Sequence, residues 1–282
     1  IIPAFNEARN IPELLNRISN VSITNKLDIE VVFVDDGSTD NTENVITDFT
    51  DKKIQILYVK FRKNQGKSEA LSEGIKRANN ELVITMDADL QDQPEEIPKF
   101  IAMINSGYDV VSGWKKIRYD NLLFKNIPSY IFNFITRKIL KSKLRDINCG
   151  FKAYRKEVWV EISVYGDFHR FIPALAANEG FKVGELEVIH APRIYGKSKY
   201  GLGRLISGMF DLLTLFFLSF YQKRPLHFFG SLGIGFISIS LIGFVYLGNL
   251  WISGISIGNR PMLAISILIL SIGFQIIMLG LV

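Results

Sequence analysis

Two long stretches without a charged side chain make up the end of the sequence. No Asp, Glu, Lys or Arg occurs in residues 225–259 or 262–282, and Arg260 is the one charged residue between them. Residues 226–250 give 25 positions and residues 262–282 give 21. At about 1.5 Å per residue, each is long enough for a helix to cross a hydrocarbon core of roughly 30 Å. We predict a two-helix transmembrane hairpin over residues 226–282. The alternative is a pair of buried core helices, which rarely use uncharged runs above about 18 residues.

The charges that precede the hairpin predict its orientation. All 28 acidic residues and 32 of the 33 basic ones lie in residues 1–225, with Lys223 and Arg224 directly before the first span. By the positive-inside rule, the N-terminal region is expected in the cytoplasm and the hairpin tip outside. We therefore predict a multi-pass protein of the cell membrane with an interfacial helix over residues 203–225. The lone Cys149 excludes a disulfide within the chain and fits a reducing compartment.

Apolar β-rich runs alternate with amphipathic segments through the first 114 residues. Alternation of this kind indicates βαβ units, that is, an α/β, Rossmann-like domain with a mostly parallel sheet and helices on both faces. We assign residues 1–202 to this domain. The sequence opens on Ile1-Ile2-Pro3 as if midway through a strand, so we expect native residues beyond both of its ends. The expected strands are 30–34, 54–61, 82–86 and 109–112, and the expected helices are 11–18, 41–49, 68–78 and 94–104.

The most informative motif is Asp87-Ala88-Asp89, which follows an apolar run. Ligands of open α/β sheets bind at the carboxyl ends of strands, so this motif is expected at the binding edge. Two carboxylates there can bind a hard divalent cation together, and Gln91 can add a neutral oxygen. The alternative is that Asp87 caps a turn and the following acids begin a helix, where they suit the helix dipole.

A second acidic pair, Asp35-Asp36, follows the run 31–34 and precedes Gly37. An aspartate at this position can accept hydrogen bonds from a base or from ribose hydroxyls, which selects a nucleotide. The alternative is a structural loop whose glycine permits the turn and whose next polar residues cap a helix. Lys67 at an expected helix start can reach a phosphate, although its surroundings lack the spacing of an NTPase phosphate loop.

Residues 115–145 contain nine basic residues and one acid, Asp120, interleaved with apolar side chains. This pattern is typical of a basic amphipathic segment that faces an anionic membrane surface. The alternative is an ordinary helix that packs on the sheet.

Other classes of function find little support. A net charge of 32 − 28 = +4 over residues 1–225 is modest, and we expect no nucleic-acid partner. The three histidines show no metal-binding spacing, and no Ser/His/Asp or Cys/His nucleophile motif is present.

Six polar motifs occur along the chain, at residues 3–7, 35–40, 64–67, 87–92, 146–155 and 193–199. Together and in this order they resemble those of the family 2 glycosyltransferases. More narrowly, they resemble the polyprenyl-phosphate glycosyltransferases, the group of dolichyl-phosphate mannosyltransferase and the bactoprenol glucosyltransferases. The resemblance covers essentially the whole chain, including the two C-terminal spans.

The resemblance implies a GT-A fold, a nucleotide-sugar donor, a Mg²⁺ or Mn²⁺ ion and a polyprenyl phosphate acceptor in the membrane. Asp89, Asp146 and Arg193 would be catalytic, and Asp87, Asp89 and Gln91 would hold the metal. The nucleotide sugar would contact Pro3, Phe5, Glu7, Asp35, Asp36, Lys67 and Asp87. The acceptor phosphate would contact Lys115, Arg118, Lys125, Ser129 and Lys199. A homo-oligomer, such as a tetramer, is expected by family analogy.

The implied reaction is transfer of one hexose, with glucose from UDP-glucose suggested by the subgroup alone, to undecaprenyl phosphate. Asp146 would be either a base or, as we favour, a group that orients the sugar. A processive polysaccharide synthase is a rival, but the Gln-x-x-Arg-Trp motif of those enzymes does not occur here. A second rival is a catalytically silent membrane adaptor. Such a protein would have no use for the acids of the two motifs, Asp35, Asp36, Asp87 and Asp89.

Overall fold

The fold is described from a computed structural model of the chain. It describes residues 1–51, 53–116, 136–137, 144–162, 168–192, 210, 213–214, 216–217, 221 and 224–281. The chain divides into two compact units, Ile1–Leu212 and Leu213–Val282. The boundaries expected at residues 202 and 225 fall in or beside segments outside the described residues, so they stay predictions.

The first unit is built on two sets of strands. β1 (Ile2–Ala4), β2 (Glu30–Asp35) and β3 (Gln55–Lys60) pair in parallel, in the order β1-β2-β3. β4 (Leu82–Thr85), β5 (Val110–Trp114), β6 (Lys152–Arg155) and β7 (Val183–Glu187) pair in the order β4-β6-β5-β7. The amide of Met86, just after β4, donates to the carbonyl of Ile1 at 3.2 Å and so joins the two sets.

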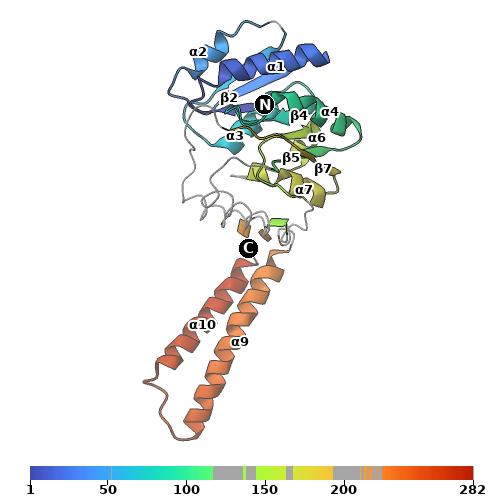
Figure 1. The fold of residues 1–282 in the computed structure, drawn as a ribbon. Coiled ribbons are helices and arrows are strands. Elements are labelled where there is room, and N and C mark those ends of the chain that lie inside the picture. Colours follow the sequence, from blue (N-terminus) through green and yellow to red (C-terminus); the bar gives the residue numbers. More distant parts are fainter. Residues whose placement is uncertain are drawn as a thin grey trace. The chain divides into compact units, whose positions relative to one another are not determined.

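Helices follow most strands (Figure 1), and several of them have a proline near their first residue. They are α1 (Ile11–Asn25), α2 (Thr42–Thr47), α3 (Lys67–Arg77), η1 (Pro94–Glu96), α4 (Ile97–Asn105), α6 (Lys156–Glu161), η3 (Phe168–Arg170) and α7 (Ile172–Asn178). Proline lies in the first turn of α1, α4 and α7. The first turn leaves backbone N–H groups without intrahelical partners, so the missing proline N–H costs nothing there.

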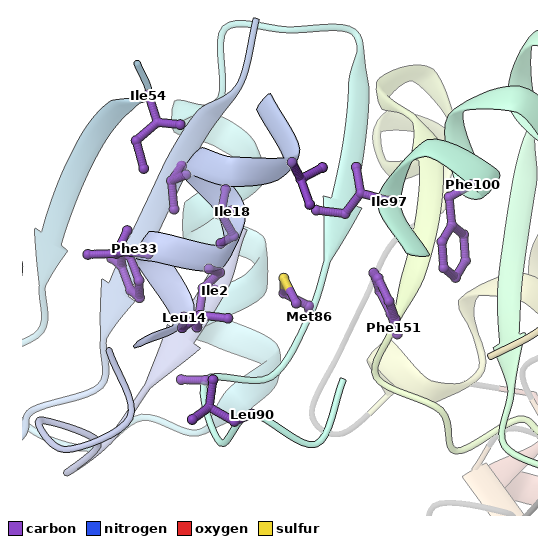
Figure 2. Packing of buried hydrophobic residues seen from close by; sticks show 14 of the residues in the cluster. Ile2, Leu14, Ile18, Phe33, Ile54, Met86, Leu90, Ile97, Phe100 and Phe151 are labelled. Carbon is purple, nitrogen blue, oxygen red and sulfur yellow. The ribbon is translucent and has the colours of Figure 1, made fainter. Parts of the chain in front are cut away.

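The side chains of β2 point alternately to the two faces of the sheet, and all of its central ones are apolar, which explains why helices cover both faces. Val31 and Phe33 pack in one core cluster with α1, whereas Val32 and Val34 pack in another with residues of α3. Successive side chains of a strand point to opposite faces, so an uninterrupted apolar run needs cover on both sides. Figure 2 shows the first of these clusters, in which Phe33 lies near Leu14 of α1, and Phe151 lies beside Phe100 of α4.

The four expected strands and four expected helices of the first 114 residues are confirmed, with ends that differ by a few residues, and α1 continues to Asn25. The sheet is mostly parallel as expected, but β6 runs antiparallel to both β4 and β5. β6 and β7 were not anticipated from the sequence. Lys152 and Arg155 lie in β6, and charged residues of this kind do not indicate a buried strand.

The second unit contains α9 (Pro225–Ile252) and α10 (Pro261–Leu279), which are long and apolar enough to cross a membrane. The two helices of the expected hairpin are thus confirmed as helices. They pack through small residues. A Cβ atom added at Gly233 would lie 2.7 Å from the carbonyl oxygen of Gly273, and the hydroxyl of Ser240 donates to the carbonyl of Ser266 at 2.7 Å. Such close approach is how helices associate in lipid, where burial of apolar surface offers little gain.

Gly233→Leu should destabilise the hairpin, because a side chain there meets the backbone of α10. Gly235→Leu on the same helix is the matched control, since nothing lies within 4 Å of a Cβ atom at that position. Overpacking of this kind costs about 1–3 kcal/mol. In thermal unfolding measured by circular dichroism in detergent, we expect a lower Tm for Gly233→Leu and an unchanged Tm for Gly235→Leu. Equal Tm values for the two variants would contradict this packing.

Candidate active site

The loops after β1 and β2 interlock at the carboxyl ends of these strands. Asn6, in the left-handed region with φ 56°, donates its backbone N–H to the Ser38 hydroxyl at 2.9 Å. The Asn6 side-chain oxygen accepts from the Thr39 amide at 2.8 Å. The Glu7 amide donates to the Thr42 hydroxyl at 3.1 Å. The segment 3–7, for which the family resemblance implies contact with the nucleotide sugar, is therefore held by the loop that follows Asp35 and Asp36.

Asp35 is fully buried, and both of its oxygens are used within the protein. One accepts from the Ser38 amide at 2.7 Å and the other from the Tyr58 hydroxyl at 2.7 Å. Burial, together with the Asp35 carboxylate, raises the pKa of Tyr58 above its ordinary value. The structure thus gives Asp35 a role in shaping the loop after β2.

Asp36 turns away from Asp35 and binds the loop that precedes α3. Its two oxygens accept from the amides of Gln65 at 2.6 Å and Gly66 at 3.0 Å. Burial raises the pKa of Asp36, and these two amides act in the opposite direction. Gly37 allows the reversal between the two loops, because it has φ 76° and its Cβ position lies 2.8 Å from the carbonyl carbon of Lys63.

The loop after β4 brings Asp87, Asp89 and Gln91 to the same edge. Lys67, at the start of α3, forms an ion pair with Asp87, whose side chain is 33% exposed. Asp89 accepts from the Gln91 amide at 3.2 Å across Leu90, which has φ 62°. The ion pair thus brings together Lys67, which is expected to contact the nucleotide sugar, and Asp87, which is expected to bind the metal.

Gly150 lies directly beside this ion pair. A Cβ atom at Gly150 would lie 3.0 Å from Asp87 Oδ2 and 3.1 Å from Lys67 Nζ. The Gly150 carbonyl accepts from the Thr85 hydroxyl at 2.9 Å. The motif 146–155 therefore approaches the motif 87–92 at a point where a glycine leaves room for both charged groups.

Asp146 is 1% exposed and lies next to the end of β5. Its oxygens accept from the amides of Lys115 at 3.4 Å and Asn148 at 3.2 Å. Its own amide donates to Glu185 at 3.0 Å, and burial raises the pKa of that glutamate. Lys115 points its ammonium at Asp92, at 2.7 Å, with only 12% of the lysine side chain exposed.

Several other predicted site residues lie outside the described residues. They are Arg118, Lys125, Ser129, Arg193 and Lys199, together with most of the basic segment 115–145 and of the interfacial helix 203–225. Pro3, Phe5 and Glu7 are half-buried in the β1 segment.

Three buried polar residues of this region were not singled out from the sequence. Lys152 is 2% exposed and donates to the carbonyls of Ile147 at 3.3 Å and Arg170 at 3.2 Å. His169 Nδ1 lies 2.5 Å from the Ser68 hydroxyl, next to Lys67. Asp92 is fully buried. Asp92 and Lys152 both lie inside quoted motifs, which is the one signal that marks them.

A cavity of about 350 Å³ lies at the opposite ends of the strands, between the start of β2 and the start of β4. Apolar residues such as Ile1, Val31 and Val83 contribute much of its lining. Asp35, Asp36, Asp87 and Asp89 do not line this cavity, and we assign the site to the strand ends that carry these acids.

The sequence pattern described as "Glycosyl transferase family 2" matches residues 1–162. The chain belongs to glycosyl transferase family 2. This confirms the resemblance on which the expected GT-A fold and sugar transfer depend.

Two relatives of this family 2 glycosyltransferase agree with that assignment, and one solved structure of another protein has a similar fold. Dodecaprenyl-phosphate galacturonate synthase from Rhizobium johnstonii is 35% identical, over 99% of this chain and 84% of the relative. Undecaprenyl-phosphate 4-deoxy-4-formamido-L-arabinose transferase from Klebsiella pneumoniae is 31% identical, over 100% of this chain and 85% of the relative. The fold is similar to that of glucosyl-3-phosphoglycerate synthase from Mycobacterium tuberculosis in complex with Mn²⁺, UDP and phosphoglyceric acid. The TM-score is 0.60 at 17% identity, over 77% of this chain and 76% of that one.

The side chains expected to bind a metal in the glycosyltransferase suit a hard divalent cation. Asp87, Asp89 and Gln91 would supply oxygen ligands, which Mg²⁺ and Mn²⁺ prefer. Within the described part of the chain, no group of three or more His, Cys, Asp or Glu side chains could hold a metal by itself. A cation bound here would therefore take further ligands from a diphosphate and from water.

The buried Lys152 of the glycosyltransferase predicts a pH-dependent stability. Burial lowers the pKa of Lys152 from 10.5 to about 8. The unfolded chain therefore binds the proton more tightly than the folded one, and Lys152 stabilises the fold above pH 10.5 by an amount lost as the pH falls through 8. Because of this shift, the free energy of unfolding is about 3 kcal/mol lower well below pH 8 than above pH 10.5. The Tm of the wild type minus that of Lys152→Met should rise by several degrees between pH 7.5 and 10. A constant difference would contradict the buried ammonium.

Proposed function

We propose that the chain is a membrane-bound glycosyltransferase that moves a single sugar from a nucleotide sugar to a polyprenyl phosphate. One observation carries the proposal. The match to two kinds of polyprenyl-phosphate sugar transferase extends over 99% and 100% of the chain and so includes both the site and the apolar hairpin. The fold alone does not select this acceptor, because the similar solved structure is named for a soluble phosphoglycerate product.

The site chemistry agrees with such a donor. The ammonium of Lys67 and the two carboxylates of the loop 87–91 lie at the same edge of the sheet. Gly150 leaves space beside them, because it has no side chain. The chemistry that Mg²⁺ or Mn²⁺ supplies when bound is neutralisation of the charge that grows on a departing diphosphate. Lys67 would exchange Asp87 for the diphosphate and so hold the donor on the same side.

The acceptor explains why no strong base is required. A lipid phosphate is already anionic at neutral pH, so it needs to be aligned behind the anomeric carbon rather than deprotonated. A single displacement inverts that carbon. Asp146 is buried and accepts two backbone N–H groups, so it suits a role in orienting the sugar and stabilising the positive ring better than a role as proton acceptor.

The sugar is the finer part of the proposal. Subgroup resemblance suggests glucose from UDP-glucose, and the names of the relatives add galacturonate and 4-deoxy-4-formamido-L-arabinose. The cation is Mg²⁺ or Mn²⁺. The first unit is proposed to lie in the cytoplasm, with α9 and α10 as its anchor, because basic residues precede α9.

The decisive test is transfer of radiolabelled sugar to undecaprenyl phosphate by the purified chain in detergent. UDP-glucose, UDP-galacturonate and UDP-4-deoxy-4-formamido-L-arabinose are offered in turn, with Mg²⁺, Mn²⁺ or EDTA. We expect a chloroform-soluble product from one donor, lost in EDTA. Asp89→Ala should reduce transfer at least about 100-fold, because it removes a charged group at the diphosphate. Transfer by Asp89→Ala within a few-fold of wild type would sink the metal assignment, and no lipid product from any donor would sink the acceptor.

The acceptor phosphate is proposed to lie against basic residues beyond β5. Arg118→Ala and Lys125→Ala should therefore raise the KM for undecaprenyl phosphate by about ten-fold, the value of one lost charge-assisted contact. The KM for the donor should change less than two-fold, measured in the same assay. Equal effects on both KM values would show that these residues do not discriminate the acceptor.

A further inference from the structure

A buried ion pair joins two loops of the site. Asp92 is fully buried, and its Oδ1 lies 2.7 Å from Lys115 Nζ. Burial by itself lowers the pKa of Lys115, but the surrounding negative charges, Asp92 first, raise it above its ordinary value. Lys115 is therefore charged in the interior, beside the buried Asp92.

Each member of the pair also contacts an acid of the proposed site: Asp92 contacts Asp87, expected at the metal, and Lys115 contacts Asp146, expected at the sugar. The second oxygen of Asp92 accepts the backbone N–H of Asp87 at 3.2 Å. The backbone N–H of Lys115 donates to the carboxylate of Asp146 at 3.4 Å. A continuous chain of contacts thus runs from Asp87 through Asp92 and Lys115 to Asp146.

The pair spans strands that do not touch one another. Asp92 follows β4 and Lys115 follows β5, and β6 lies between these strands in the order β4-β6-β5-β7. The ladders of β6 fix the strands but not the loops beyond their ends. A contact from loop to loop above β6 fixes the separation of the two loops directly.

Stability alone gives little reason for such a pair. Replacing a buried ion pair by apolar side chains of similar volume is often neutral or stabilising. Geometry gives a better reason, because a misplacement of about 1 Å at a reacting centre can cost roughly 100-fold in rate. The same geometry turns the ammonium of Lys115 toward Asp92, which differs from the acceptor contact expected from the sequence.

We propose that Asp92 and Lys115 form a positioning pair that fixes Asp87 relative to Asp146 during sugar transfer. The proposal rests on the proposed function for its reaction. It assigns Lys115 to the alignment of the site and leaves the acceptor phosphate to the other basic residues.

The central variant is Asp92→Leu/Lys115→Met, which removes both charges and keeps similar volume. We expect a Tm within about 5 °C of wild type, a kcat at least 30-fold lower, and a donor KM within three-fold. The single variant Lys115→Met should lose more Tm than the double variant, because it leaves the Asp92 charge buried and unpaired. Lys116→Met is the matched control, since Lys116 is exposed and pairs with Glu187 at 3.5 Å on the surface. Its kcat should stay within two-fold.

Hydrogen exchange supplies a readout that does not depend on activity. The amides of Asp87 and Lys115 should exchange at least ten-fold faster in the double variant than in wild type. If the wild type transfers no sugar to any lipid phosphate, the proposed function fails, and amide exchange still decides whether the pair joins the loops.

Three results would overturn the positioning pair. The first is a folded double variant with a kcat within three-fold of wild type. The second is unchanged exchange at both amides. The third is a Lys115→Met variant whose acceptor KM rises while kcat and Tm stay constant, which would return Lys115 to the acceptor. If the double variant does not fold, Asp92→Asn keeps the shape and removes the charge. Its kcat should fall about ten-fold, and a wild-type kcat there would also overturn the proposal.

Discussion

The loops at the proposed site are held in place because several buried carboxylates must each find a hydrogen-bond donor or a positive charge within the protein. Asp35, Asp36, Asp92 and Asp146 are all nearly inaccessible to water. An uncompensated buried carboxylate costs several kcal/mol. Each of the four accepts hydrogen bonds from backbone N–H groups, Asp35 also accepts one from a hydroxyl, and Asp92 forms an ion pair with a lysine. The loops are thus shaped by the partners that these buried acids require.

This compensation divides the acids into two groups. Asp35 and Asp36 are adjacent in sequence, but their carboxylates face different loops, and both oxygens of each are bonded within the protein. Asp87 differs, because it is a third exposed and its partner is the side chain of Lys67, which is itself a quarter exposed. A partner on a long flexible side chain can be exchanged for a ligand, whereas a backbone amide cannot. The acids that shape the site are thus distinct from the acid that is available to a substrate.

The sequence was sufficient to predict where the acids gather, because that follows from strands that end at one edge of a parallel sheet. It was also sufficient for α9 and α10, whose uncharged length leaves few alternatives. It could not give the partner of Lys115. Asp92 lies 23 positions earlier and across an intervening strand, and that strand order depends on β6, whose lysine and arginine obscure its burial. Lys152 was missed for the same reason, since a lysine is expected at the surface unless the fold shows the carbonyls that receive it.

The two units are stabilised by different physical means. The first buries an apolar core against water, with Phe33, Phe100 and Phe151 fully enclosed. In lipid that driving force is absent, so a membrane-spanning hairpin of α9 and α10 would depend on close contact and on the hydrogen bond between Ser240 and Ser266. The small residues recur every seven positions, at Gly233 and Ser240 on α9, at Ser266 and Gly273 on α10, and at Gly280 directly after α10. A repeat of seven keeps one face of each helix toward its neighbour along its whole length. The proposed transferase, with a water-soluble donor and a lipid acceptor, needs both kinds of stabilisation in one chain, and the abrupt loss of charge near residue 225 separates them.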